Sequence, residues 1–152
     1  MTLKKPTRNL RLSKVVWIKF EDFENICFRL AQEHLKFDQP IPDFITRNPG
    51  VLESCLRTPL QKFNKKDLYV SFEEKISVLF FLLIKNHPFI NGNKRIAVTT
   101  MLAVLYLNGK WIKKKPMKIY LLAKDVSRSD REDMDQQLRN IKEFLTRNVI
   151  DR

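Results

Sequence analysis

The sequence predicts an all-α fold. Apolar residues recur at helical spacing in several segments, no segment alternates apolar and polar residues, and glycine occurs only three times in 152 residues. Hydrophobic residues make up 43% of the chain and charged residues 30%, which is enough for a packed core and excludes a disordered chain. At about 150 residues per domain, one domain is expected. We place it at 17–152, behind a basic N-terminal arm at 1–16.

The N-terminal part of the domain is predicted to contain one long and one short helix. Apolar residues recur every three or four positions over 21–34, which favours a helix. Three prolines make 37–49 a loop, and 50–56 is expected to form one or two helical turns. A polar connector over 61–70 then leads to the centre of the fold.

The central element is predicted to be a helix over about 71–86. Ser71 and Glu74 have the spacing of a capping box, in which each side chain accepts a hydrogen bond from the other residue's backbone. The segment 76–84 is apolar on every face apart from Ser77, so other elements must surround it. Each such side chain contributes about 1.5–3 kcal/mol when it is fully buried. The fold is therefore expected to be a helical bundle built around this helix.

Three more elements are expected after the centre. A second core helix over about 93–107 ends at an Asn-Gly pair, which is a helix stop signal. A basic connector at 111–116 leads to a further helix over 117–126. Ser129 and Glu132 have capping-box spacing and predict the start of an amphipathic C-terminal helix. Its apolar face consists of Met134, Leu138, Ile141, Phe144 and Leu145.

Cysteine content and hydropathy restrict the protein class. Cys27 and Cys55 are too few for a disulfide scaffold or a cysteine zinc site, so two buried thiols are expected. A membrane span needs about 20 apolar residues, and the run at 76–84 is far shorter. The basic first residues also lack the apolar core of a signal peptide. We therefore expect a cytoplasmic protein with no membrane partner.

The charge of the chain points to an anionic partner. Lys and Arg total 29 against 17 Asp and Glu, which gives a net charge of +12. Ten bases and no acid lie between Lys75 and Lys124. Such a field attracts nucleic acid, nucleotide phosphate or an acidic protein surface. No helix-turn-helix or base-stacking aromatic motif accompanies it, which argues against nucleic acid, and the basic run 113–115 alone is equally typical of a solvated surface.

Residues 87–95, between the two core helices, combine a histidine with a positively charged helix start. The first turn of a helix exposes unpaired N–H groups and the positive end of the macrodipole. Gly92 lets a ligand approach the backbone closely, and Lys94 and Arg95 add two charges where acids are usually preferred. This pattern favours phosphate. An unperturbed histidine is largely neutral near pH 7, so His87 can act as a base, and the stretch indicates transfer of a phosphate-bearing group to a hydroxyl.

This stretch resembles the signature of the Fic/Doc family, H-P-F-x-[D/E]-G-N-[G/K]-R. Seven positions of the signature are met, by His87, Pro88, Phe89, Gly92, Asn93, Lys94 and Arg95. Residues 50–56, with Pro59 and Phe63 after them, are similar to the G-L-L-E-S-A-L…P segment of death-on-curing toxins, the Doc branch of the family. The resemblance extends over about 17–112 and implies a bundle of the Fic/Doc type.

The resemblance implies a role for each motif residue. His87 is implied as the general base that takes the proton from a serine or threonine hydroxyl, a contribution of about 10²–10⁴ in rate. Gly92 and Asn93 are implied to shape the anion hole, and Lys94 and Arg95 to hold the phosphates of ATP. The residues implied to border the flap that positions the target are Gly50, Val51, Leu52, Glu53 and Ser54.

Three departures from the family pattern refine these implications. Lys94 replaces the glycine of the adenylylating branch and Val98 replaces its second arginine, as in the Doc branch, where lysine accompanies a nucleotide that presents its γ-phosphate. Asn91 stands where an acid normally binds Mg²⁺, and a neutral amide is a poorer ligand for that ion. The inhibitory motif [S/T]-x-x-x-E-[G/N] is absent from the sequence, which implies inhibition by a separate protein.

The leading interpretation is the toxin of a toxin–antitoxin pair. It would use ATP and Mg²⁺ to phosphorylate a hydroxyl of a translation factor similar to elongation factor Tu, and a separate antitoxin would neutralise it. Two alternatives stay open. One is a protein AMP transferase of the same fold, and the other is a non-catalytic Fic-like binding module, which Asn91 favours because it lacks the metal-binding acid.

Overall fold

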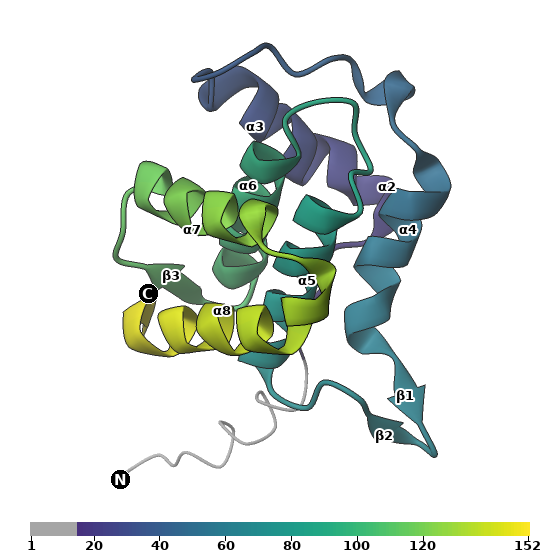
Figure 1. Cartoon of the computed structure of the whole chain (residues 1–152), viewed down its shortest axis with the longest axis vertical. Coiled ribbons are helices and arrows are strands. Elements are labelled where there is room, and N and C mark those ends of the chain that lie inside the picture. The colour runs from purple at the N-terminus through teal and green to yellow at the C-terminus, as the bar shows by residue number, and fades with distance from the viewer. Residues whose placement is uncertain (1–14) are drawn as a thin grey trace, which may run out of the picture.

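The computed structural model describes residues 15–152 (Figure 1). Most of the predicted basic arm at 1–16 therefore lies outside the described residues. At the end of that arm, Val16 is paired with Asn108, which follows α6 (Asn93–Leu107). The Val16 amide donates to Asn108 Oδ1 at 2.8 Å, and Asn108 Nδ2 donates to the Val16 carbonyl at 2.8 Å. The chain thus enters the domain beside the end of α6.

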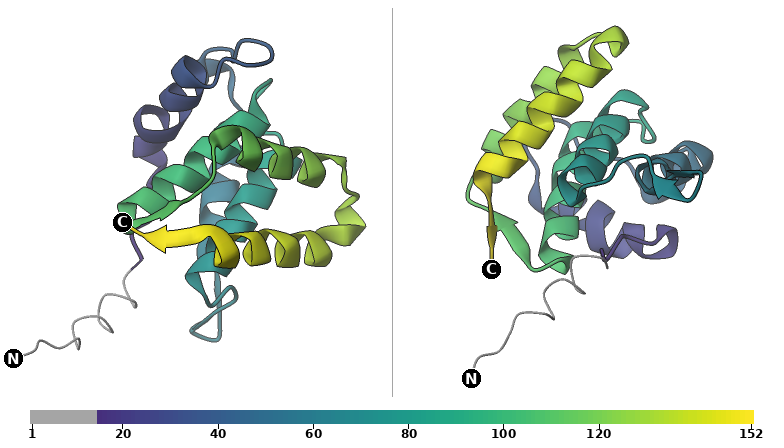
Figure 2. Two further views of the ribbon diagram at one scale, coloured as in Figure 1. Left: turned by 90° about the vertical axis from the view of Figure 1, so that its left-hand side faces the viewer. Right: turned by 90° about the horizontal axis from the view of Figure 1, so that it is seen from below.

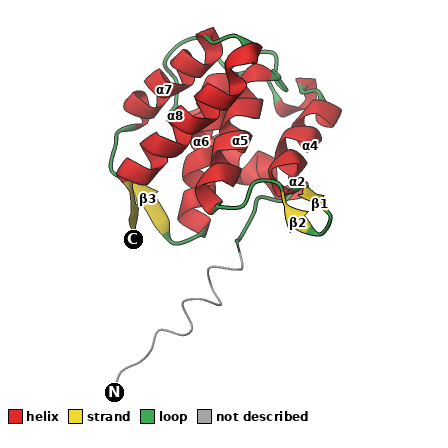
Figure 3. Cartoon of the chain, turned by 60° about the horizontal axis from the view of Figure 1, so that its bottom comes forward, coloured by secondary structure: helices red, strands yellow, loops and turns green. Residues whose placement is uncertain are grey.

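The predicted all-α fold is confirmed. Two core helices, α5 (Phe72–Lys85) and α6, pack along one another at the centre of the bundle. On one side lie α7 (Pro116–Arg128) and α8 (Met134–Asn148), and on the other lies α4 (Pro49–Arg57), as Figure 3 shows. The predicted bounds of α5 and α6 agree with these to within one residue at each end.

The N-terminal helix is continuous from Phe20 to His34 but changes its winding. It consists of α2 (Phe20–Phe23), a π-helical segment (Glu24–Phe28) and α3 (Arg29–His34). The helix predicted over 21–34 is confirmed, whereas the π-helical segment has no signature in the sequence. Such segments occur often at functional sites.

The two cysteines are buried free thiols, as the sequence predicts. Cys27 lies in the π-helical segment, and burial raises the pKa of its thiol to about 12. Cys55 lies in α4, where burial raises the pKa of the thiol to about 11. Both thiols therefore stay protonated at neutral pH and have little nucleophilic character.

The capping box that opens α5 is confirmed. Ser71 Oγ accepts from the Glu74 amide at 3.0 Å, and Glu74 Oε1 accepts from the Ser71 amide at 3.1 Å. The hydrogen bond from the Ser71 amide, together with the nearby Lys142 ammonium, lowers the pKa of Glu74. Eight apolar positions follow in α5, and all except Leu82 are buried.

The second predicted capping box is wrong. Ser129 ends α7 instead of opening α8, and its hydroxyl donates to the Val126 carbonyl at 2.7 Å. A 3₁₀ turn at Arg131–Asp133 precedes α8, and no side-chain cap is formed at Asp130 or Asp133. The unpaired carbonyls at the end of α7 offer the serine a nearer partner than the following turn does.

Two short strand pairs, which the sequence did not predict, accompany the helices. The connector at 61–70 contains a hairpin of β1 (Lys62–Phe63) and β2 (Lys66–Asp67), which projects from the end of α4 in Figure 1. The segment expected as a basic connector begins with β3 (Lys110–Ile112), which pairs antiparallel with β4 (Val149–Asp151). Figure 2 shows this pair at the end of α8, beside the C-terminus. Strands of two or three residues are too short to show alternation in the sequence.

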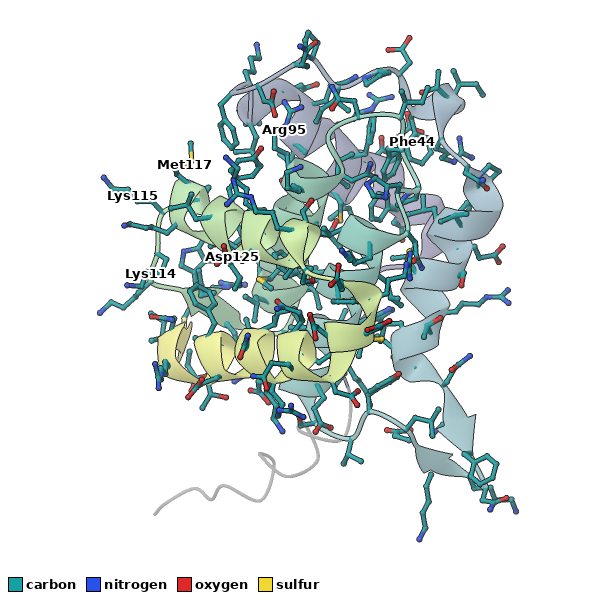
Figure 4. The ribbon with its side chains drawn as sticks, viewed as in Figure 1. Phe44, Arg95, Lys114, Lys115, Met117 and Asp125 are labelled. Carbon is teal, nitrogen blue, oxygen red and sulfur yellow. The ribbon has the colours of Figure 1, made fainter. Side chains whose placement is uncertain are left out.

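The hydrophobic core is one cluster centred on α5 and α6. Ile141 and Leu145 of α8 are fully buried in it, and the other three residues of the predicted apolar face pack against it half-buried. Among residues 15–152, no helix combines the length and hydropathy that crossing a membrane would require. The basic run after β3 is exposed, and Figure 4 shows Lys114 and Lys115 pointing away from the bundle.

Candidate active site

His87 lies immediately beyond the end of α5. Asn86 caps the helix, and His87 follows with a φ of 50°, a left-handed conformation that few side chains adopt. Its ring is exposed, and Nδ1 lies 3.2 Å from the Lys85 carbonyl oxygen. Because a carbonyl can only accept, this contact assigns the proton to Nδ1 and leaves the lone pair on Nε2. His87 is thus held in the tautomer that can take a proton at Nε2.

Asn93 holds the loop between α5 and α6 closed. Its Oδ1 accepts from the Phe89 amide at 3.0 Å, and its Nδ2 donates to the Phe89 carbonyl at 2.8 Å. Phe89 in turn packs against the rings of Phe23 and Phe28, with centroid distances of 6.1 and 5.3 Å. The loop is therefore rigidly tied both to the start of α6 and to the core.

The start of α6 presents backbone donors and a lysine. Gly92 is the N-cap residue, with a φ of 83°, and no side chain caps the helix. The amides of the first helical turn have no acceptor four residues back within the helix. Lys94 is half-buried in that turn. An anion such as a phosphate fits these donors, and the macrodipole adds to the attraction.

Arg95 is directed into the protein. Its side chain is 2% exposed, and Figure 4 places it near the start of α6, at the top of the molecule. Nη1 donates to the Leu35 carbonyl at 3.1 Å, and Nη2 donates to the Gln39 carbonyl at 2.6 Å. The phosphate contact implied for Arg95 stays a prediction, and in this conformation the guanidinium holds the backbone that follows α3.

Asn91 is also engaged by backbone on both sides. Its Nδ2 donates to the Pro40 carbonyl at 3.0 Å, and its Oδ1 accepts from the Gly92 amide at 2.8 Å. Within residues 15–152, no group of three or more histidine, cysteine, aspartate or glutamate side chains is arranged to hold a metal. Binding of Mg²⁺ at Asn91 stays a prediction, and in this conformation its neutral amide oxygen already accepts from the Gly92 amide.

The sequence model of the Fic/DOC family matches residues 17–105. The chain belongs to the Fic/Doc family. No curated protein and no solved structure matches it. The matched segment contains the whole His87 loop, all of α5, and α6 except its last two residues, whereas α7 and α8 lie beyond it. Membership implies transfer of a phosphate-bearing group as the type of chemistry.

The Fic/Doc motif of this chain is covered by residues 35–41, which we call the covering loop. Its carbonyls at Leu35, Gln39 and Pro40 accept from Arg95 and Asn91, and Ile41 packs against Gly92. Sequence reasoning missed this segment. Backbone carbonyls belong to every residue type, so the sequence carries no signal for these contacts.

The residues implied to border the flap form the first turns of α4. Asn48 caps this helix, accepting from the Val51 amide at 3.2 Å, and its own amide donates to the Pro88 carbonyl at 2.8 Å. Leu52 is buried in the core, and Glu53 pairs with Arg57 at 2.8 Å, while Gly50 and Ser54 are exposed. The hydrogen bond to Pro88 of the Fic/Doc motif therefore comes from the residue that caps α4. A role for residues 50–54 in positioning a target stays a prediction.

Proposed function

We propose that this Fic/Doc protein transfers the γ-phosphate of ATP to a serine or threonine hydroxyl of a target protein. The observation that carries the proposal is the contact of His87 Nδ1 with the Lys85 carbonyl, because it leaves Nε2 free to accept the hydroxyl proton. Beside it, the amides of the first turn of α6 and the Lys94 ammonium supply the anion site.

In this proposal each group has one task. His87 Nε2 takes the proton as the target oxygen forms its bond to the γ-phosphorus and the bond from that phosphorus to the bridging oxygen of ADP breaks. The first-turn amides and Lys94 neutralise charge on the transferred group, which is the main protein contribution to phosphoryl transfer. ATP supplies the phosphoryl group. No step is assigned to Mg²⁺, because Asn91 offers it only a neutral amide oxygen that already accepts from the Gly92 amide.

The finer features of the function follow from the resemblance to the Doc branch. Lys94 in place of glycine supports a kinase over an AMP transferase. We propose that the protein is a cytoplasmic toxin that acts on a translation factor similar to elongation factor Tu. We also propose that a separate antitoxin neutralises it, because the inhibitory motif is absent from the sequence.

A second candidate is a non-catalytic Fic-like module that binds a nucleotide or an acidic protein. The engagement of both Asn91 and Arg95 by the covering loop favours it, since two residues that the family signature directs at metal and phosphate are occupied by backbone carbonyls. An AMP transferase remains the alternative within the same chemistry.

Two measurements test the proposal. The first follows the transfer of label from ATP to proteins of a cell lysate, and the second follows the growth of cells that express the protein. We expect label from γ-labelled ATP on one protein band, none from α-labelled ATP, and loss of both label and growth inhibition in His87→Ala. His34→Ala is the matched control, because His34 is the only other histidine, is exposed and ends α3. Label from α-labelled ATP would indicate an AMP transferase. Absence of label from both would favour the non-catalytic module.

A further inference from the structure

The junction between α7 and α8 is cross-linked to the end of α5. Arg131 Nη2 donates to the Lys85 carbonyl at 2.9 Å and to Asn86 Oδ1 at 2.8 Å. In the opposite direction, Lys85 Nζ donates to the Ser127 carbonyl at 3.2 Å and to the Ser129 carbonyl. These bonds join the residues that precede His87 to a part of the chain that lies beyond the family match.

One oxygen connects this cross-link to the proposed base. The Lys85 carbonyl that accepts from Arg131 is the carbonyl that faces His87 Nδ1. A carbonyl oxygen has two lone pairs, so it can accept from both groups. Any movement of this oxygen would therefore change the partner that fixes the tautomer of His87.

We propose that Arg131 is a positioning residue for His87. It deepens the proposed function, on which it rests, because it assigns the control of the base to a residue outside the Fic/Doc motif. By bridging the Lys85 carbonyl and Asn86 Oδ1, Arg131 fixes the two residues that precede His87. Those two residues lead directly into His87, whose backbone has a left-handed conformation. Such a conformation persists only where the surrounding contacts hold it in place.

The side chain of Arg131 is suited to this role and has little part in the core. It is exposed, so its loss creates no cavity. The planar guanidinium presents its N–H groups at fixed angles, whereas a lysine ammonium is a flexible point charge. Without the bridge, the Lys85 carbonyl is freer to turn from the ring. The imidazole then loses the acceptor that favours a proton on Nδ1. The population of the tautomer with its proton on Nε2 therefore rises, and this tautomer cannot accept a proton at Nε2.

Nitrogen NMR of the imidazole rings tests this directly. The chain has two histidines, so a ¹H–¹⁵N spectrum of the rings at alkaline pH resolves both, and His34 serves as an internal reference. We expect His87 in the unaltered protein to show an unprotonated Nε2 and a protonated Nδ1. In Arg131→Ala and Asn86→Ala the two nitrogen shifts of His87 should move toward one another, with a smaller movement in Arg131→Lys. The signals of His34 should stay in place.

Arg128→Ala is the matched control, because it removes an exposed arginine three residues earlier at the end of α7. An unchanged His87 spectrum in Arg131→Ala would overturn the proposal, as would an equal change in Arg128→Ala or an Nε2–H tautomer in the unaltered protein. The experiment needs no transfer activity, so its outcome is separate from that of the labelling test.

Where label transfer is observed, Arg131→Ala should lower its turnover rate about 10-fold to 100-fold, the range typical of residues that orient a functional side chain. Its KM should not change.

Discussion

Gly92 and Ile41 are in a contact that only glycine permits. A Cβ added to Gly92 would lie 2.5 Å from Ile41 Cγ1 and 2.8 Å from Cδ1. Gly92 also has a φ of 83°, which other residues rarely adopt. The start of α6 and the covering loop therefore depend on one another at this position, and the family glycine has a packing role here in addition to any role toward a ligand.

Gly92→Ala is expected to lower the free energy of unfolding by about 2–4 kcal/mol, from backbone strain and overpacking together. Gly109→Ala is the control for backbone strain alone, since its φ is 73° and an added Cβ meets nothing within 4 Å. It should cost about 1–2 kcal/mol. Chemical denaturation of Gly92→Ala, Ile41→Ala and the double variant measures the energetic cost of overpacking between the added Cβ and Ile41. If Gly92→Ala lowers the free energy of unfolding by the same amount in the Ile41→Ala background as in the unaltered protein, overpacking against Ile41 does not contribute to the loss.

Arg95→Lys is expected to loosen the covering loop. A lysine cannot hold the Leu35 and Gln39 carbonyls together as the guanidinium does, so we expect a loss of about 1–3 kcal/mol in the free energy of unfolding. Limited proteolysis should show faster cleavage within 36–40. Lys94→Arg, at the neighbouring half-buried position, is the control. If Arg95→Lys weakens ATP binding while leaving stability and proteolysis unchanged, Arg95 acts on the nucleotide instead.

Asn91→Asp is expected to make the protein sensitive to Mg²⁺. The new carboxylate would face the Pro40 carbonyl without a donor between them, so stability should fall by about 1–3 kcal/mol in the absence of metal. Mg²⁺ should then raise the melting temperature of the variant and leave that of the unaltered protein in place, because only the variant gains a charged oxygen ligand. Potassium chloride at equal ionic strength is the control. A rise of equal size in both proteins would show that Asn91 already holds the metal.

The capping box of α5 should make the free energy of unfolding depend on pH in the acidic range. The Ser71 amide and Lys142 lower the pKa of Glu74 in the folded state. The carboxylate therefore contributes its full stabilisation above the pKa of an unfolded glutamate, about 4.3, and this stabilisation is lost as the pH falls through the lower pKa of the folded state. Glu74→Gln should flatten the pH dependence of unfolding below about pH 5. The effect should be less than about 1 kcal/mol, because 36% of the side chain is exposed. Glu143→Gln, another glutamate in an ion pair, is the control, and an equal flattening in that variant would contradict the assignment.

Local patterns in the sequence were sufficient for the helices and for the position of the motif. The spacing of apolar residues predicted α5 and α6, and Ser71 and Glu74 predicted the start of α5, because capping and helical periodicity act within a few residues. The same reasoning was wrong at Ser129, where a competing local acceptor, the Val126 carbonyl, takes the hydroxyl. The signature at 87–95 predicted the family that the comparison shows.

The directions of the motif side chains depend on contacts between segments far apart in the sequence. Arg95 donates to carbonyls 60 and 56 residues earlier in the chain, Asn91 donates to one 51 residues earlier, and Arg131 donates to one 46 residues earlier. These acceptors are backbone oxygens, which every residue carries, so no residue type marks them. Their positions depend on how the covering loop and the α7–α8 junction pack against the core helices. For that reason local sequence patterns were enough to place a basic, histidine-containing loop between two buried helices. The packing of distant segments then set which of its charges are held inward and which face solvent.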